Sequence, residues 1–503
     1  MIEQKNILSA FIKLQELAGS GDPVCVCVTD EHGFILGYTQ MDGMGSRSFT
    51  MARAKAYTAA RMGQRTAAFH DRLVREKLTL ADFGDALMTS VQGGVPIAVT
   101  LGFSAMAALY NSEFLHISTQ APTCFTALDS FTIMSIFFFV AAGVFMGTGG
   151  LSKQLINLAD ILVGKAVGGM ALATVVTCMF FAAICGSGPA TVAAIGAITI
   201  PAMVERGYDK RFAAALVACA GSIGVMIPPS NPMVVYGVIA KASIGKLFLS
   251  GIIPGILVGG VLMGYSYYLS KKNGWMGNPE KLTTKQVLLA VWEAKWALMV
   301  PVIILGGIYG GYMTPTEAAA ISAMYGLLVG VFVYKGINRH NFLSVCIECC
   351  TTSSVIIFLI AMASSFGYLL ALEQVPESIA RAILTVTSNK YLVLLLINLF
   401  LLVVGALMEP AAATIILAPI LAPIAAKLGV DLVHFGLVMT VNLAIGFITP
   451  PVGSNLFVAS ATSGLKVESI ARAAIPMIVL MIAVLFILTY VPSISLFLPN
   501  RMM

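Results

Sequence analysis

The chain has 503 residues, of which 58% are hydrophobic and 11% are charged, and its mean hydropathy is +0.90. Soluble domains carry about a quarter charged residues, so this composition excludes a soluble multi-domain enzyme for most of the chain. The same composition excludes a disordered chain and a disulfide scaffold. It also excludes a nucleic-acid binder, because a net charge of +6 in a membrane protein usually reflects cytoplasmic loops.

The charges are unevenly spread along the chain. Residues 1–93 hold 10 Lys+Arg and 10 Asp+Glu, whereas residues 94–503 hold 20 and 14. This change in composition predicts a boundary near Gly93, with a small soluble domain before a long integral-membrane domain.

The soluble segment has the pattern of a small α/β domain. Apolar spacing over residues 5–18 predicts an amphipathic helix. Val24–Val28 and Phe34–Thr39 flank a turn and predict a hairpin, and Phe49–Phe69 predicts a second helix.

This segment resembles the GlcG/HbpS family of small α/β proteins. The resemblance is carried by Asp30–Gly33, Gln40–Gly43 and Lys55–Ala59, and it implies a truncated domain over residues 1–93. The family is associated with haem binding. We favour exposed surface histidines over haem ligands for His32 and His70, and we expect no covalently bound cofactor.

Apolar runs long enough to cross a bilayer follow the boundary. The expected spans are 94–111, 130–148, 211–241, 249–270, 297–313, 317–334, 353–371, 432–462 and 472–492. Two further apolar stretches, 168–205 and 390–427, are interrupted midway by Gly or Pro and are predicted to be re-entrant hairpins.

Loop charges predict the orientation of the spans. The basic loops 271–296 and 335–340 are expected in the cytoplasm and loop 112–129 in the periplasm, which places the N-terminal domain in the cytoplasm. Lys241 and Lys246 fall on the outer side and do not fit this rule.

The membrane part contains an internal repeat. The segment that starts at Gly188 recurs from Glu409: Pro189 matches Pro410, and Pro228-Pro229 matches Pro450-Pro451. The predicted topology gives the two copies, about 130–270 and 353–492, opposite orientations in the membrane. An inverted repeat with two broken helices is typical of a secondary transporter whose site lies near the bilayer midplane.

The breaks and the hairpin tips supply candidate ligands. Proline removes amide donors, and carbonyls freed inside a bilayer need partners such as a dehydrated cation. Helix N-termini after Pro189 and Pro410 favour an anionic substrate. The predicted substrate- and ion-binding residues are Gly186, Ser187, Gly188, Pro189, Thr191, Ser222, Gly224, Pro228, Pro229, Ser230, Asn231, Glu409, Pro410, Asn442, Gly446, Thr449, Pro450, Pro451, Gly453 and Asn455.

Glu409 is the strongest single candidate for a functional residue, because a carboxylate within an apolar hairpin is expected to be functional. With Ser187 it is predicted to hold sodium; the alternative is that it only caps the helix after Pro410. Asn442 is expected either to ligate an ion or to bond a carbonyl. Glu317 and Glu348 are expected near span ends, without a special role.

The segments GSGPATVAAIGAITIPAM and MEPAAATIILAPILAPIAAKLGVD, with the two Pro-Pro breaks, resemble the large permease subunit of TRAP transporters (DctM-type) from about Gly94 to Leu498. The resemblance implies an all-α polytopic protein of the bacterial inner membrane, an elevator-type transporter and not an enzyme. It implies sodium-coupled import of organic acids such as C4-dicarboxylates. Its sodium sites match the tip around Ser187 with the break at Ser222–Ser230, and the tip around Glu409 with the break at Gly446–Gly453.

The resemblance also implies two protein partners, a periplasmic solute-binding protein (DctP-type) and a small membrane subunit (DctQ-type). Two alternatives stay open. One is a membrane-anchored haem-binding or sensory protein with an inactive transporter domain. The other is a symporter that works without a binding protein.

Overall fold

Two units make up the chain, Met1–Gln92 and Gly93–Met503. The computed structural model describes residues 25–29, 35–40, 104–105, 120–277, 284–374, 378, 389–451 and 453–502.

The first unit contains the expected hairpin. Strand β1 (Cys25–Thr29) pairs antiparallel with β2 (Ile35–Gln40), in a register that sets Cys25 opposite Gln40 and shifts between Val28 and Thr29. The helices predicted over 5–18 and 49–69, His32 and His70 lie outside the described residues, and so does the span predicted over 94–111 apart from residues 104–105.

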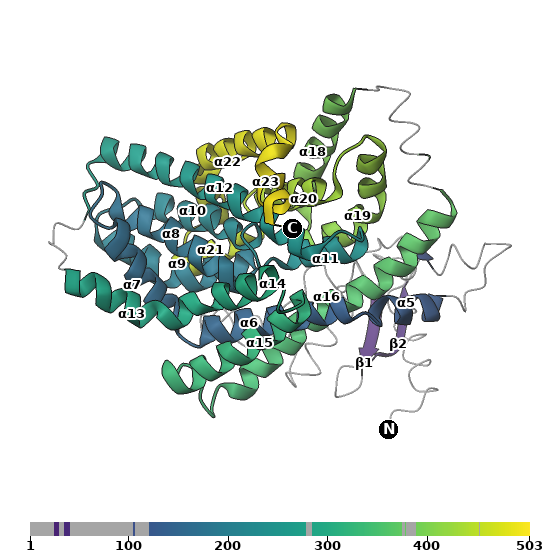
Figure 1. Ribbon diagram of the computed structural model, residues 1–503, viewed down its shortest axis with the longest axis horizontal. Coiled ribbons are helices and arrows are strands. Elements are labelled where there is room, and N and C mark those ends of the chain that lie inside the picture. The colour runs from purple at the N-terminus through teal and green to yellow at the C-terminus, as the bar shows by residue number, and fades with distance from the viewer. Residues whose placement is uncertain are drawn as a thin grey trace, which may run out of the picture. The chain divides into compact units, whose positions relative to one another are not determined.

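The described part of the second unit is helical (Figure 1). Its α-helices are α5 (Gln120–Leu128), α6 (Phe131–Thr148), α7 (Leu151–Val163), α8 (Gly169–Cys185), α9 (Gly188–Glu205), α10 (Lys210–Gly221), α11 (Asn231–Ile239), α12 (Ile244–Asn273), α13 (Thr284–Pro301), α14 (Gly307–Tyr309), α15 (Pro315–Leu328), α16 (Phe342–Leu372), α18 (Lys390–Leu407), α19 (Pro410–Lys427), α20 (Leu432–Gly446), α21 (Ser454–Ser463), α22 (Val467–Tyr490) and α23 (Pro492–Met502). A 3₁₀ turn, η3 (Ser222–Val225), extends α10, and π-helical turns η4 (Val302–Gly306) and η5 (Val329–Val333) extend α13 and α15.

Nine helices within the described ranges are long and apolar enough to cross a membrane. An 18-residue helix is about 27 Å long, close to the thickness of the hydrocarbon core. The unit therefore has the architecture of a polytopic helical membrane protein. Helix α16 begins at Phe342, well before the start expected for the span over 353–371.

The internal repeat recurs as a succession of elements. Helices α8 and α9 meet at a short tip, and α18 and α19 meet at another; α9 and α19 both have 18 residues. Each pair is followed by a broken helix, α10–α11 or α20–α21, and then by a long one, α12 or α22. In Figure 1, α8, α9 and α10 lie together, and so do α18, α19 and α20.

The two broken helices run in opposite directions. The Tyr236 hydroxyl, near the end of α11, donates to the Leu432 carbonyl at the start of α20 over 3.0 Å. At the other end, Arg211 at the start of α10 and Lys466, which follows α21, line one cavity. The end of each broken helix therefore lies beside the start of the other.

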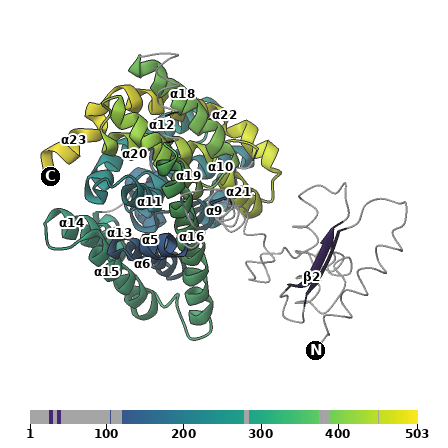
Figure 2. The same cartoon turned by 90° about the vertical axis from the view of Figure 1, so that its right-hand side faces the viewer.

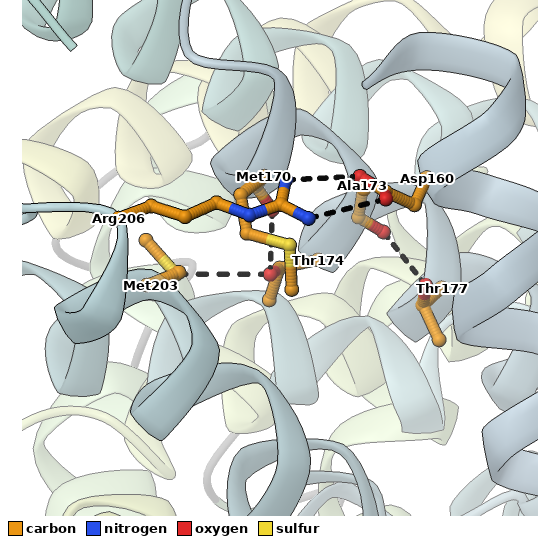
Figure 3. Close-up of polar contacts among 7 residues, drawn as sticks. All are labelled: Asp160, Met170, Ala173, Thr174, Thr177, Met203 and Arg206. Carbon is orange, nitrogen blue, oxygen red and sulfur yellow. Dashed lines mark hydrogen bonds and ion pairs between the residues drawn. The ribbon is translucent and has the colours of Figure 1, made fainter. Parts of the chain in front are cut away.

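The open end of the first hairpin is tied to the amphipathic helix α7 (Figure 3). Both terminal nitrogens of Arg206 reach the Asp160 carboxylate at 3.3 Å. Inside the hairpin, Thr174 and Thr177 donate to carbonyls one turn back, Met170 and Ala173, at 2.8 and 2.7 Å. These hydroxyls are satisfied within their own helix and call for no ligand.

Candidate functional site

The first hairpin tip is a two-residue turn between helices. Gly186 ends α8 in the left-handed region, with φ +65, and Ser187 precedes α9 in an extended conformation. The Thr191 hydroxyl donates to the Ser187 carbonyl over 2.7 Å. Ser187 forms no side-chain cap, so the first amides of α9 have no side-chain acceptor from the usual capping position.

The first break separates η3 from α11. The helix stops after Val225 and restarts at Asn231, and the Pro228-Pro229 bond between them is cis. The Ser222 and Ser230 hydroxyls donate to the carbonyls of Cys219 and Val225, at 2.7 and 2.6 Å. The hydroxyl groups of both predicted ligands in this break, Ser222 and Ser230, therefore donate their hydrogen to backbone carbonyls.

The first tip is seated on the first break. A Cβ at Gly186 would lie 2.7 Å from the Pro229 carbonyl oxygen, and one at Gly224 would lie 2.6 Å from the Thr191 hydroxyl and 2.7 Å from the Ser187 carbonyl oxygen. Both contacts are closer than a side chain tolerates. The predicted association of this tip with this break is therefore present, and both glycines are required for the close approach of two backbones.

The second break has the same plan. Helix α20 ends at Gly446, and α21 starts at Ser454 after Pro450-Pro451, again with a cis bond. Thr449 donates its hydroxyl to the Ile445 carbonyl over 2.8 Å, and Gly453 precedes α21 with φ +45. A Cβ at Gly405 of α18 would lie 3.2 Å from the Gly446 Cα, so the second hairpin packs closely against its break.

Glu409 stands at the second tip as the cap of α19. Its Oε2 accepts a hydrogen bond from the Ala412 amide over 3.0 Å, and Pro410 begins the helix. The positive end of α19 is thus already covered by a carboxylate, whereas that of α9 is not. Only one of the two helix N-termini predicted to meet an anion is uncovered in this way.

Asn455 connects the second break to the first repeat. Its Nδ2 donates to the Ala218 carbonyl of α10 over 3.0 Å, and a Cβ at Gly188 would lie 3.1 Å from its Oδ1. That oxygen is buried and has no hydrogen-bond partner among the described residues. Asn231, in the first break, has an unpartnered buried oxygen of the same kind.

Asn442 bonds to α18 rather than to the break. Its Nδ2 donates to the backbone and side-chain oxygens of Asn398 at 3.0 and 2.9 Å. Its Oδ1 is buried without a partner among the described residues. Sequence reasoning did not single out Asn398, whose polar side chain in an apolar helix is the only local signal.

The two tips share one cavity of about 650 Å³. Its walls come from α6, α8, α9, α16, the start of α19 and the segments around both breaks. Of the predicted residues, Gly186, Ser187, Pro189, Asn231 and Glu409 line it; the others lie behind these or within the breaks.

Glu348 and Thr352 of α16 also line this cavity. Glu348 lies near the start of α16, as expected, but it also lines the cavity, which the sequence did not predict. The described lining contains two glutamates and no Lys, Arg or His. A purely anionic ligand would meet unfavourable potential here unless cations were bound with it.

Comparison with known proteins decides the family. Residues 86–494 match the family model described as tripartite ATP-independent periplasmic transporter, DctM component. The chain belongs to the DctM family of TRAP transporter large permeases. It is a multi-pass inner-membrane permease, not an enzyme.

Relatives of this DctM-family chain differ in the substrate that they are named for. It is 59% identical to the isethionate TRAP transporter permease protein DctMQ of Oleidesulfovibrio alaskensis over 80% of the chain and 64% of that protein, so it spans less than two thirds of that relative. It is 43% identical to the C4-dicarboxylate permease DctM of Pseudomonas aeruginosa, over 80% of this chain and 94% of that one. It is 36% identical to the sialic acid permease SiaM of Vibrio cholerae, over 81% and 95%.

A solved structure shares the fold. The YdaH transporter of Alcanivorax borkumensis superposes with a TM-score of 0.53 at 15% identity, over 75% of this chain and 87% of that one. At the other end, residues 5–110 match the model described as haem degrading protein HbpS-like, which overlaps the DctM match over 86–110.

Proposed function

We propose that this permease is the sodium-coupled membrane subunit of a binding-protein-dependent importer of small organic acids. The cavity shared by the two hairpin tips carries the proposal. It offers an uncapped helix N-terminus at Ser187 to an anion, and Glu409, which also lines it, offers a carboxylate to a cation.

The charge of the cavity supports coupling to a cation. Two carboxylates and no basic side chain line its described part, so an organic anion binds favourably only together with positive charge. Sodium is a hard cation that takes oxygen ligands. The unpartnered oxygens of Asn231 and Asn455 and the carbonyls freed at both breaks are ligands of that kind.

The arrangement of the repeats supports alternating access. Two antiparallel copies with paired hairpin tips at one cavity are typical of transporters in which one bundle moves against another around a fixed site. We propose that the tips are re-entrant hairpins and that the site moves in an elevator motion. A periplasmic binding protein and a small membrane subunit complete the transporter, a proposal that the words tripartite and periplasmic in the family's description support.

The relatives also define the substrate panel. We propose a small carboxylate or sulfonate, with isethionate first because the relative with 59% identity is named for it, and C4-dicarboxylates next. Glycolate and sialic acid complete the panel.

The test is uptake of these radiolabelled acids into proteoliposomes that contain the chain and its small subunit. Binding protein and a sodium gradient are each supplied or withheld. We expect uptake of one acid that needs both. Uptake without binding protein would instead indicate a stand-alone symporter, and uptake without sodium would refute the coupling. A haem spectrum with no transport would support the sensory alternative.

A further inference from the structure

A second cavity, of about 560 Å³, lies far along the chain from the tips, at the start of α22. Its walls are the starts of α10 and α22 and the last third of α12, which pack together in Figure 2. Five charged side chains line it: Asp209, Arg211, Lys466, Glu468 and Arg472.

The cavity has surplus positive charge. Arg211 pairs with Asp209 at 3.1 Å, and Asp209 also caps α10. In the described structure, neither Lys466 nor Arg472 forms an ion pair, so two cations and Glu468 are left. The remaining charge of plus one complements a monoanionic phosphodiester.

The cavity also offers hydrogen-bond acceptors. Pro476, which lines it, has no amide hydrogen, so the Arg472 carbonyl lacks its usual donor one turn ahead. Glu468 also lines the cavity. A ligand that carries hydroxyl donors beside its phosphate would satisfy both acceptors.

The cavity lies where a membrane surface is expected. It is at the first turn of α22, which is long and apolar enough to cross a bilayer. Its floor includes Leu269 and Ala473, and beyond it Ile475 and Val479 are more than half exposed. An apolar surface thus continues from the charged pocket toward the hydrocarbon, as an acyl chain requires.

We propose that this cavity binds the headgroup of phosphatidylglycerol. Lys466 and Arg472 hold the phosphate, the Arg472 carbonyl and Glu468 accept from the glycerol hydroxyls, and the acyl chains run along α22. Basic pockets between membrane helices are suited to such headgroups. The proposal is independent of the proposed transport reaction, because no cavity-lining residue of the tips takes part.

The test is native mass spectrometry of the purified full chain, titrated with palmitoyl-oleoyl phosphatidylglycerol or the matching phosphatidylcholine. We expect preferential retention of phosphatidylglycerol. The double variant Lys466→Gln/Arg472→Gln should lose roughly thirtyfold in affinity, from two headgroup contacts. The matched control is Lys271→Gln/Lys272→Gln, which removes two cations from the end of α12 outside the cavity.

Equal retention of both lipids by the wild type, or an equal loss in the control variant, would overturn the proposal. Arg472→Lys, which keeps the charge, should retain most of the binding and guards against a variant that fails to fold. Competition by soluble glycerol phosphate at equal concentration would identify a free phosphate ester as the ligand and would refute the lipid assignment.

Discussion

At the scale of single residues, Glu409 both caps α19 and lines the shared cavity. Its Oε2 accepts a hydrogen bond from the Ala412 amide, while the residue also lines the shared cavity. The sequence left two roles open, helix cap and ion ligand, and the cap is present in the structure. The two roles are compatible, because a carboxylate has two oxygens.

Glu409→Gln separates these roles. Glutamine keeps an oxygen for the Ala412 amide but carries no charge, so we expect the melting temperature to change little and sodium-dependent uptake to fall at least about tenfold, as expected for loss of a charged ligand contact. Initial uptake rates against sodium concentration measure this. Glu373→Gln, at a carboxylate that does not line the cavity, is the control, and an unchanged sodium dependence in Glu409→Gln would refute the ion site.

Polar residues were the hardest to interpret from the sequence. Glu409 was found because it interrupts an apolar run. Glu348 was missed because the polar start of α16 was excluded from the expected span, although the helix continues through it. The hydroxyls of Ser222, Ser230 and Thr449 looked like ligands but donate to their own backbone, a choice that residue type alone does not reveal.

At the scale of elements, each tip needs backbone in close contact with a break. Gly186 meets two demands together, a left-handed φ and contact with the Pro229 carbonyl. Gly464, after α21, has a similar φ of +70 but open space around it. Comparison of substitutions at Gly186 and Gly464 therefore distinguishes the effect of a left-handed φ from the effect of a steric clash.

Gly464→Ala should cost about 1 kcal/mol of stability, the usual price of a left-handed L-residue, and leave uptake nearly intact. Gly186→Ala should cost more and abolish uptake, because its Cβ overlaps the Pro229 oxygen and displaces the tip from the break. Thermal melts and uptake rates of both variants test this. Equal effects of the two substitutions would show that the tip contact is unimportant.

The helix breaks themselves were predictable. Proline pairs at repeat-equivalent places stop both helices where expected, and Gly186 ends α8 at the first tip. The bond between Asn455 and Ala218 was not predictable, since its partners are 237 residues apart and no local pattern joins them.

At the scale of the whole molecule, all described residues of the shared cavity lie at Val140 or beyond. The DctM match begins at residue 86. Composition was sufficient to predict the division into a charged front segment and an apolar remainder, and the motifs were sufficient for the family. The substrate was not predictable, because relatives named for isethionate, C4-dicarboxylates and sialic acid match about the same share of the chain.

Deletion of residues 1–85 should leave uptake within about twofold of the full chain, since the DctM match begins at residue 86 and every described residue that lines the shared cavity lies beyond it. Uptake by the two proteins, reconstituted in equal amounts, tests this. Loss of uptake by a correctly inserted, monodisperse deletion variant would assign the front segment a role in transport.

The contact of Asn455 with Gly188 and Ala218 has a consequence for how this sequence can vary. A Cβ at Gly188 would press on both the Asn455 oxygen and the Phe447 ring at 3.1 Å. A larger residue at 188 is therefore expected to need room at both 447 and 455, in the other copy of the repeat. An exchange of one copy between relatives is expected to work best when the matching residues of the other copy are carried with it.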